Sequence, residues 1–324
     1  MEALVKETEA GNGEKISIVV PVYNEGEHIR NSMQHVMDIC VNAGIAYELV
    51  LIDDGSTDSS WAILSEMARN NHDVTAVRLS RNFGKEAALC AGIEHARGNA
   101  VIVMDADLQH PPELIPEFVR LWKEGADVVE GVKESRGREN PFYRLCAKAF
   151  YGFIKKSSSI DLDNASDFKL LDRQVVEAMK QMPERVTFFR GMSAWVGFER
   201  VTVPFSVAER VNGKSKWSLR RLIGLAVSSV TSYTTLPLQC ITGMGFLMLL
   251  CTLILGIETL FMKFSGRADN GFTTVILLLL FIGSLIMISL GIIGLYLTKI
   301  YHEIKARPRY LTSRVIRDGE EKKQ

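Results

Sequence analysis

Acidic and polar loops recur three times in the first third of the chain, and their side chains are of the kind that bind metal ions and nucleotides. The loops are PVYNE (21–25), DDGSTD (53–58) and DADLQHPP (105–112), and each follows a short apolar run. Carboxylate and amide oxygens are ligands for hard divalent cations, and they accept hydrogen bonds from bases and ribose hydroxyls. The three loops are therefore the first candidates for a functional site.

Asp105 and Asp107 form an Asp-x-Asp pair directly after an apolar run. Two carboxylates at a strand end can hold Mg²⁺ or Mn²⁺, which neutralises a diphosphate and stabilises it as a leaving group. The same residues could instead cap a helix or turn near Pro111 and Pro112. Their position after a strand, beside two other acidic loops, favours the metal site.

Asp53 and Asp54 precede Gly55 and Ser56, a pattern typical of a turn followed by a helix N-cap. Two adjacent acids beyond a buried strand can also accept hydrogen bonds from a base N–H or a ribose hydroxyl. In the first loop, proline and tyrosine side chains could form an apolar and aromatic wall for such a base. Both interpretations stay open for this loop.

The segments around the loops alternate between short strands and helices. Apolar runs predict strands at 16–20, 47–52, 75–79 and 100–104, and helical patterns predict helices at 26–43, 59–70 and 85–96. Such alternation is typical of an α/β fold with a mainly parallel sheet and helices on both faces. Ligands bind these sheets beyond the carboxyl ends of the strands, which is where the three loops lie.

Two long apolar segments, 236–261 and 272–298, follow this predicted domain. Each is long enough to cross roughly 30 Å of hydrocarbon, so with the short link 262–271 they predict a two-helix transmembrane hairpin. A pair of buried core helices is the alternative, but two such long apolar runs are rare in soluble folds. Glu258 is the only charged residue in either segment.

Lysine and arginine residues flank the hairpin and are scarce in its link, which has only Lys263 and Arg267. The flanking cations are Lys214, Lys216, Arg220, Arg221, Lys299, Lys305, Arg307, Arg309, Arg314 and Arg317. This bias places both ends of the hairpin, and hence the α/β domain, in the cytoplasm.

The resulting organisation has seven parts. They are a polar N-terminal tail (1–15), the α/β domain (16–216), an interfacial helix (217–235), the two spans (236–261 and 272–298), a short non-cytoplasmic loop (262–271) and a basic cytoplasmic tail (299–324). Within the domain, the aromatic and basic segment 140–156 is either a second interfacial helix or an ordinary amphipathic helix on the sheet.

The overall composition excludes several classes of protein. The chain has 38 lysines and arginines against 38 aspartates and glutamates, so no charge excess points to nucleic acid. Its 5 cysteines form no Cys-x-x-Cys pair, which argues against a zinc site or a disulfide framework and favours a reducing compartment. The polar N-terminus lacks the apolar core of a signal peptide.

In combination, PVYNE, DDGSTD, RNFGKEAALCAG and MDADLQHPPE resemble the motifs of the family 2 glycosyltransferases, whose GT-A fold is a Rossmann-like domain with a mainly parallel sheet. SDFKLLDR (166–173), AERVNGKSKWS (208–218), the two spans and YHEIKARPRY (301–310) are similar to the branch that acts on polyisoprenyl phosphates. That branch includes dolichyl-phosphate mannose synthases, aminoarabinose-lipid transferases and bactoprenol glucosyltransferases. The similarity extends from about Ile16 to Ile316.

The resemblance implies roles for individual residues. The nucleotide site would be lined by Pro21, Tyr23, Glu25, Asp53, Asp54 and Asp105. Mg²⁺ or Mn²⁺ and the donor diphosphate would be held by Asp105, Asp107 and Gln109. Phosphate groups would be bound by Arg210 and Lys216, with help from Lys214. This basic cluster could also anchor the chain electrostatically at the membrane surface, and both roles are compatible.

Asp167 lies in the loop where family 2 enzymes usually place a catalytic base. A phosphate monoester has a second pKa of about 6, so a lipid phosphate acceptor is already largely anionic at neutral pH. Asp167 therefore either removes a proton, or holds donor hydroxyls and orients the attack.

The resemblance implies an inverting transfer of a hexose, with UDP-glucose as the leading donor, to undecaprenyl phosphate. Another sugar nucleotide such as GDP-mannose is an alternative. A polysaccharide synthase is a weaker one, because the chain has no Q-x-x-R-W motif and only two spans. A non-catalytic scaffold or a flippase fits the aspartate loops and the two spans less well. The implied location is the bacterial cytoplasmic membrane, and similarity to bacterial members suggests a homotetramer.

Overall fold

The computed structural model describes residues 14–26, 28–133, 166–182, 184, 188–205, 236–265 and 272–323. The chain divides into two compact units, one made of residues 1–147, 160–215 and 308–324 and the other of residues 148–159 and 216–307. The predicted interfacial helix 217–235 falls outside the described residues, as do the segment 140–156, with its two alternative interpretations, and Arg210, Lys214 and Lys216.

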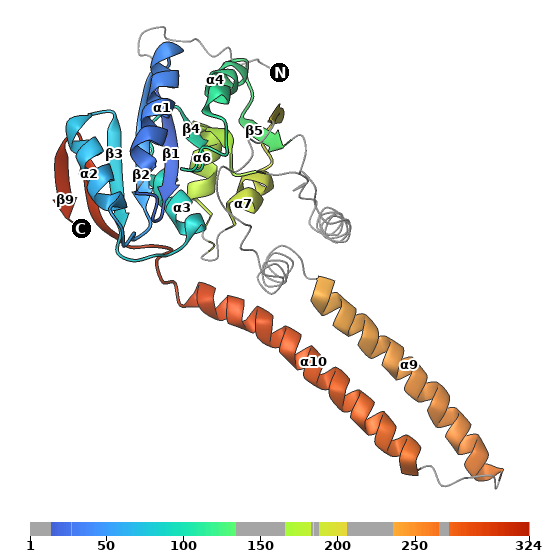
Figure 1. Ribbon diagram of the computed structural model, residues 1–324. Helices are drawn as coiled ribbons and strands as arrows, with labels where there is room; N and C mark the ends of the chain where they lie inside the picture. The colour runs from blue at the N-terminus through green and yellow to red at the C-terminus, as the bar shows by residue number, and fades with distance from the viewer. Residues whose placement is uncertain are drawn as a thin grey trace. The chain divides into compact units, whose positions relative to one another are not determined.

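Alternating strands and helices form the first half of the α/β unit, as the sequence predicts (Figure 1). In chain order they are β1 (Ile16–Val22), α1 (Ile29–Asn42), β2 (Tyr47–Asp53), α2 (Ser60–Asn70), β3 (Val74–Leu79), α3 (Lys85–His95) and β4 (Ala100–Val103). Strands β4, β1, β2 and β3 pair in parallel, in that order. Their carboxyl ends therefore lie along one edge of the sheet.

The second half of the unit adds strands that run in both directions. Its elements are the 3₁₀ turn η1 (Pro112–Leu114), α4 (Ile115–Lys123), β5 (Val128–Lys133), β6 (Lys169–Asp172), α6 (Arg173–Lys180), α7 (Phe189–Trp195) and β7 (Arg200–Phe205). Strand β6 is antiparallel to both β4 and β5, whereas β7 is parallel to β5. With β8 (Thr312–Arg317) and β9 (Glu320–Lys323), the described strands form one sheet in the order β7-β5-β6-β4-β1-β2-β3-β8-β9.

Both faces of the sheet are covered, and most residues of its central strands are apolar, with Ser17 of β1 and Glu48 of β2 among the buried polar exceptions. Helices α1, α2 and α4 pack on one face, and α3, α6 and α7 pack on the other. Gly92 lets α3 approach the sheet closely, because a Cβ at this position would lie 2.1 Å from Cγ1 of Val19. This close packing fixes the position of α3, whose first residue is Lys85.

The sequence predicts a basic tail at 299–324 without assigning secondary structure to it, and the structure shows the end of a helix and two strands there. Residues up to Ile304 belong to the preceding helix, and β8 and β9 extend the sheet beyond β3. Ile316 of β8 is fully buried, and the Arg317 guanidinium donates to Oγ1 of Thr75 and to the carbonyl of His95. Because the segment is rich in cations, its sequence does not indicate a strand. In the structure, β8 pairs with β3 and covers a sheet edge that would otherwise be exposed.

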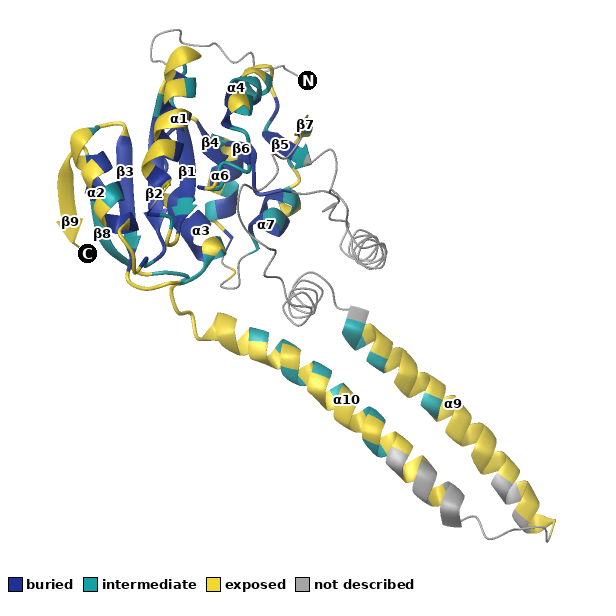
Figure 2. Cartoon of the chain, in the orientation of Figure 1, coloured by how far each residue is buried: buried dark blue, intermediate teal, exposed yellow. Residues whose placement is uncertain are grey.

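The second unit contains α9 (Leu236–Phe264) and α10 (Phe272–Ile304), which contact each other. Within the described residues, Pro237–Glu258 and Phe281–Ile304 are long and apolar enough to cross a membrane. The described side chains of both helices are largely exposed (Figure 2), and an apolar surface of this extent is typical of a segment that contacts a membrane or another protein. Helix α10 continues beyond the predicted end of the second span at residue 298.

Truncation of Ile316 tests whether β8 is an integral strand. We expect Ile316→Ala to lower the free energy of unfolding of the α/β unit by about 3 kcal/mol, because it leaves a cavity in the core. Leu311→Ala, at a side chain that is 54% exposed, should change it by less than about 0.5 kcal/mol. Unfolding of both variants in detergent can be followed by tryptophan fluorescence. Equal stability of the two variants would mean that β8 adds nothing to the core.

Candidate active site

The three acidic loops meet at one edge of the sheet, because β1, β2 and β4 are parallel neighbours. Asp167 joins them from a strand of opposite direction. Lys169, the first residue of β6, pairs with Val103, the last residue of β4, so the residues just before β6 lie beside the residues just after β4. The topology therefore brings Asp105 and Asp167 together from positions far apart in the sequence.

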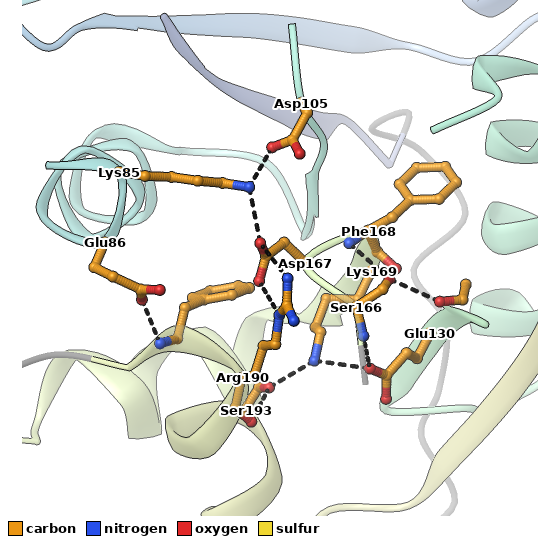
Figure 3. Close-up of polar contacts among 12 residues, drawn as sticks. Lys85, Glu86, Asp105, Glu130, Ser166, Asp167, Phe168, Lys169, Arg190 and Ser193 are labelled. Carbon is orange, nitrogen blue, oxygen red and sulfur yellow. Dashed lines mark hydrogen bonds and ion pairs between the residues drawn. The ribbon is translucent and has the colours of Figure 1, made fainter. Parts of the chain in front are cut away.

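Lys85 joins these two aspartates directly (Figure 3). Its ammonium nitrogen lies 2.5 Å from Oδ1 of Asp105 and 2.8 Å from Oδ2 of Asp167. Arg190 of α7 clamps Asp167 from another side: Nε donates to Oδ1 at 2.7 Å and an Nη donates to Oδ2 at 3.0 Å. We refer to Lys85, Asp105, Asp167 and Arg190 as the ion cluster.

Charge pairing sets the protonation of the ion cluster. Burial alone would raise the pKa of Asp167, but its hydrogen bonds to Arg190 and the charges of Arg190 and Lys85 outweigh this and lower the pKa well below the ordinary value. Burial would lower the pKa of Lys85, but Asp105 and Asp167 raise it above its ordinary value. Both groups are therefore charged at neutral pH.

Asp53 and Asp54 are buried, and protein donors engage both carboxylates. Asp54 accepts from the backbone N–H groups of Phe83 and Gly84, at 2.7 and 2.9 Å. Asp53 accepts from the N–H of Ser56 at 3.1 Å and pairs with Arg78 across 3.2 Å. Burial raises the pKa of both aspartates. Asp54 thus fixes the turn that leads into α3, and a nucleotide contact by either aspartate stays a prediction.

Hydrogen bonds join the first loop to the second. The N–H of Asn24 donates to Oγ of Ser56 at 3.0 Å, and the N–H of Glu25 donates to Oγ of Ser60 at 3.0 Å. Asn24 adopts a left-handed φ of 55°, which turns the chain back over the second loop. Pro21 is half-buried and Tyr23 is 46% exposed at this edge, which suits the predicted wall for a base.

The third loop carries the predicted metal ligands. Asp107 is exposed, Asp105 and Gln109 are partly exposed, and Leu108 between them has a left-handed φ of 54°. The loop is anchored by His110, which accepts from the N–H of Asp105 at Nδ1 and stacks on Phe168 at 5.1 Å. The residue next to Asp167 thereby supports the loop of Asp105.

The donor set fits a hard divalent cation that a substrate helps to bind. Burial raises the pKa of Glu25, and the negative charges of Asp107, Asp58 and Asp105 add to this effect, so these carboxylates lie close enough to interact. Among the described residues, no three His, Cys, Asp or Glu side chains form a complete metal cage. An incomplete set of one or two carboxylates is what Mg²⁺ uses when phosphate oxygens and water supply its other ligands.

Sequence reasoning missed two members of the ion cluster. Lys85 lies in the motif RNFGKEAALCAG, but the motif alone does not say which acids its side chain reaches. Arg190 lies 23 residues from Asp167 and outside every motif recognised in the sequence. Its role depends on how α7 packs beside β6, and the N–H of Phe189 at the start of α7 is held by the Glu86 carboxylate at 2.6 Å.

Comparison with known proteins agrees with this geometry. The sequence matches Glycosyl transferase family 2 over residues 17–180. An uncharacterized glycosyltransferase of Synechocystis sp. is 40% identical over 92% of this chain and 95% of its own length. The bactoprenol glucosyl transferase of Shigella phage SfII is 37% identical over 92% of this chain and 97% of its own length.

Among solved structures, the glucosyl-3-phosphoglycerate synthase of Mycobacterium tuberculosis in complex with Mn²⁺, UDP and glucosyl-3-phosphoglycerate covers 68% of this chain, and 78% of that chain is covered. The two share 21% sequence identity with a TM-score of 0.45. The family match and the full-length relatives confirm the GT-A fold and the activity class expected from the motifs: the chain belongs to glycosyl transferase family 2.

Proposed function

We propose that this glycosyltransferase moves glucose from UDP-glucose to undecaprenyl phosphate at the cytoplasmic face of a bacterial membrane. The ion cluster carries the proposal, because it joins the Asp-x-Asp loop, where a donor diphosphate would bind, to Asp167. The 37% identity to a bactoprenol glucosyl transferase along 92% of the chain supports this sugar and acceptor. Helices α9 and α10 support action on a lipid.

In the proposed reaction, a phosphate oxygen of the acceptor forms a bond to the anomeric carbon of glucose. The bond from that carbon to the β-phosphate oxygen of UDP breaks, its electron pair leaves with UDP, and the configuration inverts. Asp105, Asp107 and Gln109 would hold Mg²⁺ or Mn²⁺, which when bound neutralises the departing diphosphate. Arg210 and Lys216 are the proposed ligands of the phosphate groups.

Asp167 is better suited to hold cations beside the substrate than to accept a proton. Both of its carboxylate oxygens are engaged, one by Arg190 and the other by Arg190 and Lys85. Since its pKa is lowered, it is a poor base. An acceptor phosphate with a second pKa of about 6 needs no base at neutral pH. We therefore assign Asp167 to the placement of charge and substrate.

The chain path supports a membrane hairpin with both ends on one side. The chain leaves the sheet after β7 and returns to the same sheet at β8, and the candidate spans lie between these strands. Two crossings bring the chain back to the side it left, and the cations that flank the spans favour the cytoplasm for that side.

A panel of donors tests the reaction. With purified protein and undecaprenyl phosphate, we expect labelled UDP-glucose to give a chloroform-extractable product that mild acid hydrolyses. UDP-galactose, UDP-N-acetylglucosamine and GDP-mannose should give at least about tenfold less product. A sugar site that pairs with the hydroxyls of glucose would leave polar groups unpaired with these donors. A preference for another donor would overturn the choice of sugar. An insoluble polymer would instead identify a synthase, and no transfer from any donor would overturn the proposal.

Removal of the metal or of Asp107 tests the role of the third loop. We expect a chelator to abolish turnover, Mn²⁺ or Mg²⁺ to restore it, and Asp107→Asn to lower kcat by at least about 100-fold, because the diphosphate then leaves without its counterion. Asp73→Asn is the matched control, since this aspartate is exposed and its carboxylate pairs, within the described part of the chain, with Lys15 at the surface. Full turnover by chelated enzyme would refute the metal assignment.

The pH dependence of Asp167→Asn distinguishes a base from a positioning carboxylate. The pKa of Asp167 lies below its ordinary value of 3.8, so this group stays ionised as the pH falls toward 5. The acid limb of kcat/KM for the acceptor should therefore follow the acceptor phosphate, with a midpoint near about pH 6. We expect Asp167→Asn to lower kcat by about 100-fold and to leave this midpoint unchanged. A base role predicts instead that the limb disappears in the variant.

A further inference from the structure

Two oppositely charged side chains are buried next to the proposed reaction centre but do not touch it. Glu130 of β5 and Lys169 of β6 are directly paired across the strands and are 1% and 2% exposed. Oε1 of Glu130 lies 3.2 Å from the ammonium nitrogen of Lys169. Burying two charges costs hydration free energy, and the attraction between the charges barely offsets this cost. An apolar pair of similar size would therefore stabilise the sheet about equally well.

The contacts of this pair lead to Asp167 by two routes (Figure 3). Oε1 of Glu130 accepts from the N–H of Ser166 at 2.9 Å, which fixes the backbone directly before Asp167. Lys169 donates to Oγ of Ser193 at 2.8 Å, and this hydroxyl donates to the carbonyl of Arg190 at 3.1 Å. The first route holds the loop of Asp167, and the second holds the residue that clamps its carboxylate.

We propose that Glu130 and Lys169 are positioning residues that orient Asp167 and Arg190 for sugar transfer. The proposal rests on the proposed function, because it takes Asp167 to lie at the reaction centre. Arg200 at the start of β7 completes the arrangement, with one Nη 3.1 Å from Oε2 of Glu130. Glu130 thus has a cation at each carboxylate oxygen, and its orientation is determined from both sides.

A double substitution separates positioning from stability. Glu130→Leu with Lys169→Met removes both charges and keeps an apolar volume, so the sheet should remain folded. The unfolding temperature should fall moderately, because the buried N–H of Ser166 loses its acceptor. We expect kcat to fall by about 30-fold or more, while KM for UDP-glucose changes by less than about threefold, because the donor site is intact and only alignment is lost. A folded double variant with wild-type kcat would overturn the proposal.

Ser193→Ala gives a second, milder test that does not depend on the double variant. The substitution removes one hydroxyl between Lys169 and Arg190, so folding should be retained and kcat should fall by about fivefold. Wild-type kcat in this variant would overturn the route through Lys169, whatever the double variant does.

Glu48→Gln is the matched control. Glu48 is also a buried carboxylate that organises a loop, accepting from the N–H of Arg97 and from Oγ of Ser17, but it lies where β1 and β2 begin. We expect this variant to unfold at a lower temperature with an unchanged kcat. A drop in kcat like that of the double variant would overturn the proposal, because general loosening of the fold would then explain both.

The same assay separates failure of this inference from failure of the proposed function. If the wild type is inactive, the proposed transfer reaction is overturned. If Asp167→Asn is fully active, the proposed role of Asp167 is overturned. Activity that is lost in Asp167→Asn but retained in the double variant and in Ser193→Ala would overturn the positioning role alone.

Discussion

The Lys85 ammonium lies between the carboxylates of Asp105 and Asp167 and lets two acids from different strand ends remain charged near each other. Its ammonium nitrogen is within 2.8 Å of both Asp105 and Asp167. Without it, the two negative charges would repel each other in a partly buried place where water screens poorly. Lys85 can reach both because it is the first residue of α3, whose preceding turn is held by Asp54 and whose contact with the sheet depends on Gly92.

The two sides of this cluster differ in how firmly the protein holds them. Asp167 is buried in a network of charged and hydroxyl groups that extends to β5, β6 and α7. The orientation of its carboxylate is therefore fixed by these elements. Asp107 and Gln109 lie on a more exposed loop and have fewer protein partners. In the proposed reaction, a firmly held Asp167 beside an incomplete set of metal ligands would suit a metal that binds together with a phosphate-bearing substrate.

Local pattern predicted much of the α/β unit, because its central strands are buried on both faces and appear as short, mostly apolar runs. The ends of β1 to β4 fall within two residues of the predicted ones, and the three loops meet as expected. Asp105 and Asp167 could be named from the sequence. Their link through Lys85, and the clamp of Arg190, could not, because these contacts depend on the reversed direction of β6 and carry no periodic signal. Strand β8 could not be predicted from the local sequence for a related reason: it forms by pairing with the edge of β3, which is distant in the sequence.

That pairing has a consequence for how the protein is made. Strand β8 is synthesised after both apolar helices, yet it joins β3: Oγ of Ser313 donates to the carbonyl of Arg78, 235 residues away in sequence. Pairing between segments so far apart in sequence is slow, and it cannot begin until β8 has left the ribosome. Until then β3 has an open edge. The described sheet is therefore completed only after both apolar helices have been synthesised, so its edge at β3 is closed late in folding.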